Sequence, residues 1–279
     1  MRIEFTKMHG LGNDFMVFDL PPDGTLPTAE QWRALADRHT GVGFDQAVVL
    51  QPPRRHGTDA YYRIFNADGG EAEQSGNGAR CVAALLHRRA GHQGGTIAID
   101  CSAGLMRAKV LADDLVSIDL GVPNFNPKSL PFDVPAQNAS YMISAGGEHL
   151  EIGAVSIGNP HAVLRVESVD DAPVERVGRA LQSDSRFPRQ VNVGFMQVID
   201  RAHIRLRVYE RGVGETASCG TGACAAVAIG RRRRRLDEEV RVLVRGGELR
   251  VNWKGPGEPI WLTGPAEVSF EGHLEVQTP

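Results

Sequence analysis

Hydrophobic and polar residues alternate in short runs along most of the chain, and turn residues separate one run from the next. Alternation with a period of two is typical of half-buried strands, whereas apolar residues three and four apart are typical of helices. The pattern therefore predicts many short strands and few helices. The predicted strands cover residues 2–6, 15–18, 46–50, 61–66, 96–101, 105–111, 116–120, 141–143, 150–157, 162–166, 191–196, 204–209, 240–251 and 260–270.

One helix is predicted from its own capping signals. Thr28 precedes apolar residues at Trp32, Leu35 and Ala36, and Gln31 follows Thr28 by three residues. In such a pair, each side chain can bond to the backbone N–H of the other residue. We therefore expect a helix over residues 28–38, and the apolar spacing predicts another over residues 174–181.

Two stretches of the sequence repeat one pattern. Residues 71–85 read EAEQSGNGARCVAAL, and residues 215–229 read ETASCGTGACAAVAI. Each has a polar run, a small residue with a hydroxyl or thiol, a Gly-x-Gly turn and an apolar helical run. Such a repeat predicts two similar domains, each presenting the N-terminus of a helix. With Ser75 opposite Cys219, the coinciding positions are Gly70 with Gly214, Glu71 with Glu215, Gly76 with Gly220, Gly78 with Gly222, and Ala79 with Ala223.

The N-terminus of a helix is suited to binding an anion. Its first backbone N–H groups lack intrahelical partners and lie at the positive end of the helix dipole, and glycines let a carboxylate or phosphate approach closely. A cysteine at this position has a lowered pKa, so we expect Cys219 to form a thiolate near neutral pH. Two such helix ends would hold one small anionic molecule between two side chains on opposite faces.

Several polar residues at strand ends have two interpretations. Asn13 in the GLGND segment lies in either a ligand-binding loop or an ordinary turn. Gln46 and His161, taken alone, fit structural hydrogen bonding. Asn159 repeats the Gly-Asn pattern of Asn13, and Asn192 in a buried strand must find partners in the protein or in a ligand.

Composition limits the classes of function. The chain has 279 residues, enough for about two domains, and its net charge of -3 argues against a nucleic-acid partner. The sequence has no run of about 18 apolar residues that would predict a membrane span, and its start lacks a signal region, so we expect a cytoplasmic protein.

The four cysteines do not have metal-ligand spacing, which predicts free thiols and no metal site. Cys81 and Cys101 fit small buried hydrophobic residues. Five successive arginines, Arg231–Arg235, follow the second repeat. We interpret them as solvated cations that oppose the dipole of the preceding helix.

A domain boundary is expected in residues 121–135, which are rich in proline and polar turn residues. The expected N-terminal domain is residues 1–120 plus 265–279 and carries the Ser75 loop. The expected C-terminal domain is residues 121–264 and carries the Cys219 loop.

Six segments, in order, resemble those of diaminopimelate epimerases: MHGLGNDF, FNADGGEAEQSGNGARC, VSIGNPHAV, QVNVGFMQV, VYERGVGETASCGTGACAA and WKGPGEPIWLTGPAEV. The resemblance covers nearly the whole chain. It implies an α/β (α+β) fold of two pseudo-symmetric domains, each a curved mixed or antiparallel sheet wrapped around a central helix, with the active site in the cleft between them. It also implies a homodimer, no cofactor, and interconversion of LL- and meso-2,6-diaminopimelate for lysine and peptidoglycan synthesis.

The resemblance also implies roles for individual residues. Inverting an amino-acid α-carbon needs a base on one face and an acid on the other, and preorganised donors must stabilise the carbanion. Arg211 suits a bidentate grip on the far carboxylate. The implied catalytic residues are Cys219, Ser75 at the family's cysteine position, His161 and Glu210. The implied substrate-binding residues are Asn13, Gln46, Asn66, Gly76, Asn77, Asn159, Asn192, Glu210, Arg211, Gly220 and Thr221.

One position departs from the family's pattern, which reads QCGNGAR where this chain has Ser75. A hydroxyl is far less acidic than a thiol, whose pKa is about 8.5 and lower at a helix end. Ser75 therefore cannot supply a thiolate base, and we expect a loss of at least the ~10²–10⁴-fold that general acid–base catalysis contributes. The two explanations are a deliberate Cys-to-Ser change, which disables turnover or prevents a disulfide with Cys219, and a natural variant.

Two other functions fit the same residues. A one-base dehydratase of hydroxyproline-type substrates resembles this arrangement, because related racemase-like proteins pair one cysteine with one hydroxyl residue. A non-catalytic diaminopimelate-binding protein is the other alternative.

Overall fold

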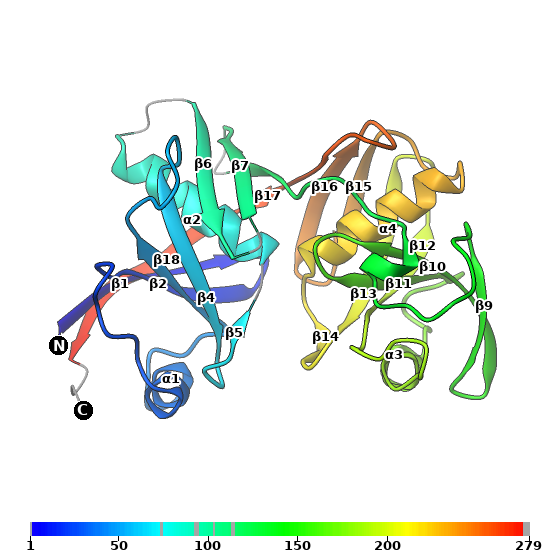
Figure 1. The fold of residues 1–279 in the computed structure, drawn as a ribbon, viewed down its shortest axis with the longest axis horizontal. Helices are drawn as coiled ribbons and strands as arrows, with labels where there is room; N and C mark the ends of the chain where they lie inside the picture. The colour runs from blue at the N-terminus through cyan, green and yellow to red at the C-terminus, as the bar shows by residue number, and fades with distance from the viewer. Residues whose placement is uncertain (1, 73–74, 92–94, 103, 113–114, 276–279) are drawn as a thin grey trace. The chain divides into compact units, whose positions relative to one another are not determined.

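The computed structural model describes residues 2–72, 75–91, 95–102, 104–112 and 115–275. The chain divides into two compact units (Figure 1): unit 1 is Met1–Ile118 with Gly264–Pro279, and unit 2 is Asp119–Thr263. The segment Gly121–Pro135 thus belongs to unit 2.

Unit 1 is a mixed sheet with two neighbouring helices, α1 and α2. Its strands lie in the order β18–β1–β2–β3–β4–β6–β7–β8, and short β5 pairs with β4. The pairs β2/β3 and β4/β6 are parallel, and the other neighbours are antiparallel. The elements are β1 (Arg2–Gly10), β2 (Asn13–Asp19), α1 (Ala29–Ala36), β3 (Gln46–Gln51), β4 (Ala60–Asn66), β5 (Glu71–Ala72), α2 (Gly76–Arg89), β6 (Thr96–Cys101), β7 (Gly104–Val110), β8 (Leu115–Asp119) and β18 (Glu267–Glu275).

Unit 2 repeats this plan. Its strands lie in the order β9–β10–β11–β12–β13–β15–β16–β17, and β14 pairs with β13. The parallel pairs are β11/β12 and β13/β15. The elements are the 3₁₀ helix η1 (Pro127–Ser129), β9 (Tyr141–Ala145), β10 (Glu148–Ser156), β11 (Pro160–Arg165), α3 (Val174–Gln182), β12 (Asn192–Val198), β13 (His203–Glu210), β14 (Gly214–Thr216), α4 (Gly220–Arg232), β15 (Glu239–Val244), β16 (Gly247–Trp253) and β17 (Ile260–Pro265).

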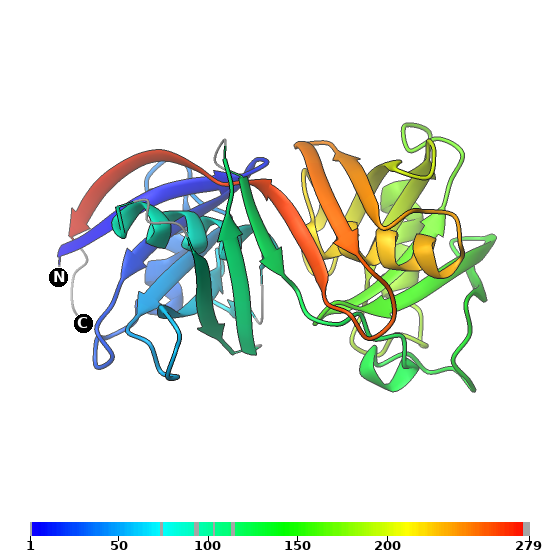
Figure 2. The same ribbon diagram turned by 90° about the horizontal axis from the view of Figure 1, so that it is seen from above.

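The strand register matches in the two units. Phe15 pairs with Gln46 in unit 1, and His161 pairs with Asn192 in unit 2. In both units the sheet curves around its long helix (Figures 1 and 2), and α4 is buried from Gly220 through Gly230. The predicted fold of two pseudo-symmetric sheet domains, each around a central helix, is confirmed.

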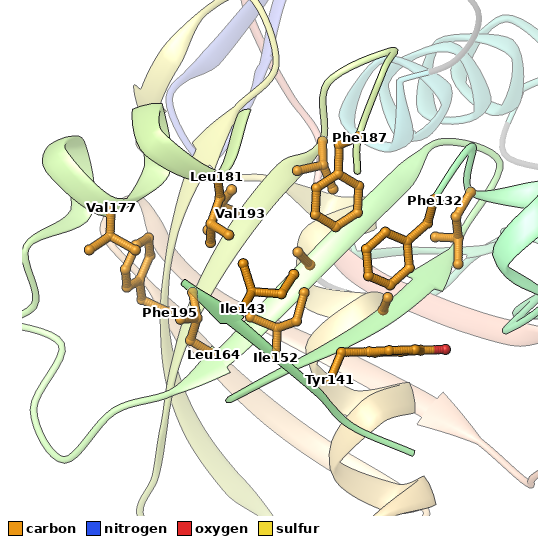
Figure 3. Close-up of a cluster of buried hydrophobic side chains, with 14 of the residues drawn as sticks. Phe132, Tyr141, Ile143, Ile152, Leu164, Val177, Leu181, Phe187, Val193 and Phe195 are labelled. Atoms are coloured by element: carbon orange, nitrogen blue, oxygen red, sulfur yellow. The ribbon is translucent and has the colours of Figure 1, made fainter. Parts of the chain in front are cut away.

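Each unit has its own aromatic core. In unit 1, Trp32 on α1 stacks on Phe65, with ring centroids 5.1 Å apart. The capping box predicted for this helix is present, with Thr28 and Gln31 bonded to each other's backbone N–H. In unit 2, Phe132 stacks on Phe187 at 4.4 Å (Figure 3).

Two local expectations differ from the structure. Phe132 and the buried Leu130 lie in the segment that composition marked as a linker; instead, it packs into the core of unit 2, because these two apolar side chains follow η1. The strand predicted over residues 162–166 begins earlier, as β11, at Pro160, a position that suits a residue without an N–H. His161 therefore lies within a strand.

The arginine run ends α4 and is only partly solvated. Arg234 adopts a left-handed backbone with φ 59°. The Arg235 N–H bonds to Gly230 O at 2.9 Å and the Arg234 N–H to Arg231 O at 2.8 Å, which is the Schellman pattern. The Arg232 guanidinium lies 4.4 Å from the ring centroid of Phe125. The run thus closes the helix by specific contacts.

No helix among the described residues is both long and apolar enough to cross a membrane.

Candidate functional site

In unit 1, Ser75, Gly76 and Asn77 lie at the N-terminus of α2, and Asn13, Gln46 and Asn66 lie on the three neighbouring strands β2, β3 and β4. Ser75 is the N-cap, and its Oγ accepts a hydrogen bond from Gly78 N at 3.1 Å. Asn77 Nδ2 donates to Asn13 Oδ1 at 3.0 Å, and Gln46 Nε2 donates to Asn66 Oδ1 at 2.9 Å. We call the group the unit 1 cluster: Asn13, Gln46, Asn66, Ser75, Gly76 and Asn77.

A charged network that the sequence patterns did not reveal lies beside Asn13. Lys7 Nζ donates to Asp14 Oδ2 at 2.5 Å and also to Gly43 O. Arg38 donates two hydrogen bonds to Asp14, both at 2.8 Å, and a third to Asp45 Oδ1 at 2.7 Å. Burial alone would raise the pKa of Asp14, but the bonds from Arg38 and Lys7 outweigh it and hold that pKa well below its usual range.

In unit 2, Cys219 is the N-cap of α4. Its Sγ donates to Glu210 Oε2 at 3.1 Å and lies 3.7 Å from Thr221 Oγ1. The Thr216 hydroxyl donates to the other oxygen of Glu210. The carboxylate is therefore bonded on both oxygens, one of them by the thiol.

The expectation of a ready Cys219 thiolate is wrong. Burial raises the pKa of Cys219 well above its ordinary value, and the negative charge of Glu210 and its hydrogen bond to the thiol raise it further. Bonds from Thr221 and from the Gly222 backbone oppose the rise but do not overcome it. Burial and the Glu210 carboxylate thus outweigh the stabilisation from the helix end and favour the thiol form of Cys219.

His161 is a neutral, fully buried imidazole. Burial, followed by the positive charge of Arg211, lowers its pKa to about 3. Its Nε2 lies 2.8 Å from Asn159 Oδ1, so Nε2 carries the hydrogen and donates it. Asn159 Nδ2 in turn donates to Thr221 Oγ1 at 3.3 Å, which connects His161 to the N-terminus of α4.

Asn192 bonds to two backbone segments. Its Nδ2 donates to Pro160 O at 3.1 Å, and its Oδ1 accepts from Arg211 N at 2.9 Å. It therefore fixes the start of β11 and the backbone of Arg211. The Arg211 side chain donates to Arg189 O at 3.5 Å. We call this group the unit 2 cluster: Asn159, His161, Asn192, Glu210, Arg211, Cys219, Gly220 and Thr221.

The matched strand register pairs positions of the two clusters: Asn13 with Asn159, Gln46 with Asn192, Asn66 with Glu210, and Ser75 with Cys219. Unit 1 has the amide of Asn66 at the position where unit 2 has the carboxylate of Glu210, which accepts a hydrogen bond from the Cys219 thiol. The two N-cap side chains also differ, because the Ser75 oxygen accepts a bond from the helix, whereas the Cys219 sulfur donates to Glu210.

Both units carry one further repeated contact. Arg63 holds Glu71 by two hydrogen bonds of 2.8 and 2.7 Å, and Arg207 holds Glu215 by two of 2.6 and 2.8 Å. The repeat marked Glu71 and Glu215 as equivalent but gave them no role. An arginine eight residues before each glutamate was the available signal.

The described residues contain no group of three or more His, Cys, Asp or Glu side chains that could hold a metal ion. All four cysteines are free and buried, as predicted for Cys81 and Cys101.

Known proteins match this chain over nearly its whole length. A diaminopimelate epimerase of Alkalilimnicola ehrlichii is 51% identical over 278 residues, 99% of this chain and 100% of that protein. Among solved structures, a hydroxyproline epimerase from Agrobacterium vitis matches with a TM-score of 0.71 at 18% identity, covering 100% of this chain and 94% of that one. A Bacillus anthracis phenazine biosynthesis protein of the PhzF family matches with a TM-score of 0.70 at 18% identity, covering 99% and 100%. At this identity, these two structures show the fold alone.

The sequence profile of the diaminopimelate epimerase family matches residues 5–126 and 153–269, which include every residue of the unit 1 and unit 2 clusters. The six segments that resemble this family and the repeated sheet around a helix both agree with that match. The chain belongs to the diaminopimelate epimerase family.

Proposed function

We propose that this chain is a cytoplasmic epimerase that interconverts LL- and meso-2,6-diaminopimelate without a cofactor. The observation that carries the proposal is the repetition of one cluster in both units, each with a proton-bearing N-cap at the start of a buried helix. Inversion of a carbon centre needs one such group for each face. The backbone N–H groups at Gly76–Asn77 and Gly220–Thr221 suit the α-carboxylate of the substrate.

On the unit 2 side, Cys219 and Glu210 act together. The thiol donates to Glu210 Oε2, so the proton can pass to this carboxylate and leave a thiolate that takes the α-proton of the substrate. In the reverse direction the protonated thiol delivers a proton to the carbanion. Neutral His161 orients Asn159, and through it the Thr221 hydroxyl beside the sulfur.

On the unit 1 side, Ser75 is a weak participant. Its oxygen accepts the Gly78 N–H, and its hydroxyl can still donate a hydrogen. It cannot act as a standing base near neutral pH, and Asn66 offers no carboxylate where unit 2 has Glu210. We therefore propose that epimerisation is slowed by at least ~10²–10⁴-fold relative to the same chain with cysteine at this position.

Incorporation of solvent deuterium into each diaminopimelate isomer tests the proposal. We expect this chain to exchange the α-proton of one isomer through Cys219, and Ser75→Cys to epimerise at least ~10²-fold faster. Ser117→Cys, which adds a thiol on β8 at a position that is not part of the unit 1 cluster, is the matched control and should leave both rates unchanged. If Ser75→Cys did not epimerise diaminopimelate faster than the unmodified chain, the proposal that Ser75 slows the reaction would be refuted.

Absence of exchange in both this chain and Ser75→Cys would refute an epimerase. In that case diaminopimelate binding without exchange would identify a binding protein. Water loss from a hydroxyproline without diaminopimelate binding would identify a dehydratase.

We also propose that the chain forms a homodimer through β18. The supporting observation is its exposed apolar side chains, Val268 at 37% and Phe270 at 49% of their full exposure. The Phe270 ring also packs edge-on against Phe5 at 6.0 Å. Sedimentation should give a dimer for this chain and a monomer for Phe270→Glu. A monomeric unmodified chain would contradict the proposal.

A further inference from the structure

A directed chain of hydrogen bonds runs through the unit 1 cluster. Arg80 Nη2 donates to Asn77 Oδ1 at 3.0 Å, Asn77 Nδ2 donates to Asn13 Oδ1 at 3.0 Å, and Asn13 Nδ2 donates to Asp45 Oδ2 at 2.9 Å. Every bond points the same way, from the guanidinium of Arg80 to the carboxylate of Asp45. We call Arg80, Asn77, Asn13 and Asp45 the amide relay.

The two ends of the amide relay determine which way its amides face. A guanidinium can only donate hydrogen bonds, and an ionised carboxylate can only accept them. If either asparagine amide rotated by half a turn, it would set two N–H groups or two oxygens against each other. Asn77 is only 4% exposed, so water would not readily replace a lost bond. The Asn13 amide is therefore fixed with its oxygen toward Asn77 and its nitrogen toward Asp45.

The carboxylate end of the relay is itself held in place. Arg38 donates to Asp45 Oδ1 at 2.7 Å, and the backbone N–H of Asp14 donates to Asp45 Oδ2 at 3.1 Å. Arg38 also holds the side chain of Asp14, which Lys7 bonds from the buried side. Two cations and two carboxylates thus balance each other, and the acceptor for Asn13 stays in one position.

An amide nitrogen carries two hydrogens, and Asp45 takes one of those on Asn13. Among the described residues the other meets no protein acceptor, and Asn13 is partly exposed. Resting on the function proposed above, we propose that the amide relay makes Asn13 an obligatory hydrogen-bond donor, so that this cluster binds an ionised carboxylate of the substrate more tightly than a neutral amide, whose oxygen forms the weaker hydrogen bond. Asp45 and Arg38 act as positioning residues, since they reach the ligand only through Asn13.

Asp45→Asn tests the amide relay. This variant keeps the shape of the side chain but removes its charge, and its new amide can meet Asn13 in either orientation. The measurement is the dissociation constant of diaminopimelate, from isothermal titration calorimetry, against that of an analogue with one carboxylate changed to a carboxamide. We expect Asp45→Asn to reduce the preference for the carboxylate by about tenfold, with a larger effect on KM than on kcat. Asp23→Asn, which removes an exposed carboxylate of the same unit, is the matched control and should keep the preference.

Arg38→Gln is a second variant; the Arg38 side chain is 54% exposed, so this substitution opens no cavity in the core. It should weaken the preference in the same direction, because Asp45 loses its clamp. An unchanged preference in both variants would overturn the proposal. Slow solvent exchange of the Asn13 side-chain amide, accelerated in Asp45→Asn, reports the relay without any ligand. If the unmodified chain bound neither diaminopimelate nor the analogue, both the proposed function and the proposed selectivity would be refuted. If both variants bound them with the preference of the unmodified chain, only the role of the amide relay would be refuted.

Discussion

Burial of neutral His161 should make unit 2 sensitive to acid. Its pKa is about 3 in the folded chain, against 6.5 for an ordinary histidine. A group with a lowered folded-state pKa contributes stability that is present above the unfolded pKa and is lost as the pH falls toward the folded value. Between pH 6.5 and pH 3, the unfolded chain binds a proton that the folded chain excludes. The loss amounts to about 1.4 kcal/mol for each pH unit.

His161→Gln removes this titration. We expect the difference in unfolding free energy between the unmodified chain and the variant to shrink by about 2.7 kcal/mol when the pH falls by about two units below 6.5. Urea unfolding followed by tryptophan fluorescence measures it, because Trp253 is buried in unit 2. His149→Gln, at an exposed position, controls for loss of any histidine. A difference that stays constant with pH would refute the assignment of His161 as a buried neutral group.

Three further changes test the packing and charge described above. Arg234→Gly should stabilise the chain by about 1 kcal/mol, because glycine adopts the left-handed backbone at φ 59° without steric strain; a lower melting temperature would contradict this. Gly178→Ala should destabilise it by about 1–3 kcal/mol, since a Cβ would lie 2.5 Å from Tyr209 Cγ; an unchanged denaturation midpoint would show that the ring moves aside. Glu210→Gln should lower the pKa of Cys219 by removing a neighbouring negative charge. Ultraviolet titration of the thiolate against a Cys219→Ala baseline measures that pKa, and an unmoved midpoint would count against the charge effect.

The sequence predicted the two-unit fold because the pattern of residues that determines each unit occurs twice in the chain. The polar run, the Gly-x-Gly turn and the apolar run around Ser75 recur around Cys219, and each became the start of a buried helix. The capping box of α1 was also predicted correctly, because the two residues that form it, Thr28 and Gln31, are only three positions apart. Such patterns predict elements well because they depend on spacing alone.

The sequence did not predict features that depend on distance in space. A helix N-terminus suggested a thiolate at Cys219, but burial and the carboxylate of Glu210 decide its pKa, and neither can be weighed from spacing. The bonds from Lys7 and Arg38 to Asp14 likewise join three separate segments. Phe132 was obscured by the prolines around it, although its ring lies in the core of unit 2.

The repeated arginine–glutamate pairs have a consequence for how such a protein changes over time. In each unit, one ion pair joins two neighbouring strands that precede the N-cap in the sequence. Arg63 on β4 bonds to Glu71 on β5, and Arg207 on β13 bonds to Glu215 on β14. The ion pair that joins β4 to β5 does not involve position 75, so exchange of oxygen for sulfur there changes the cap bond from Gly78 N but leaves this pair in place. A lineage can silence its chemistry, or recover it, by exchanging one atom while the architecture is inherited intact.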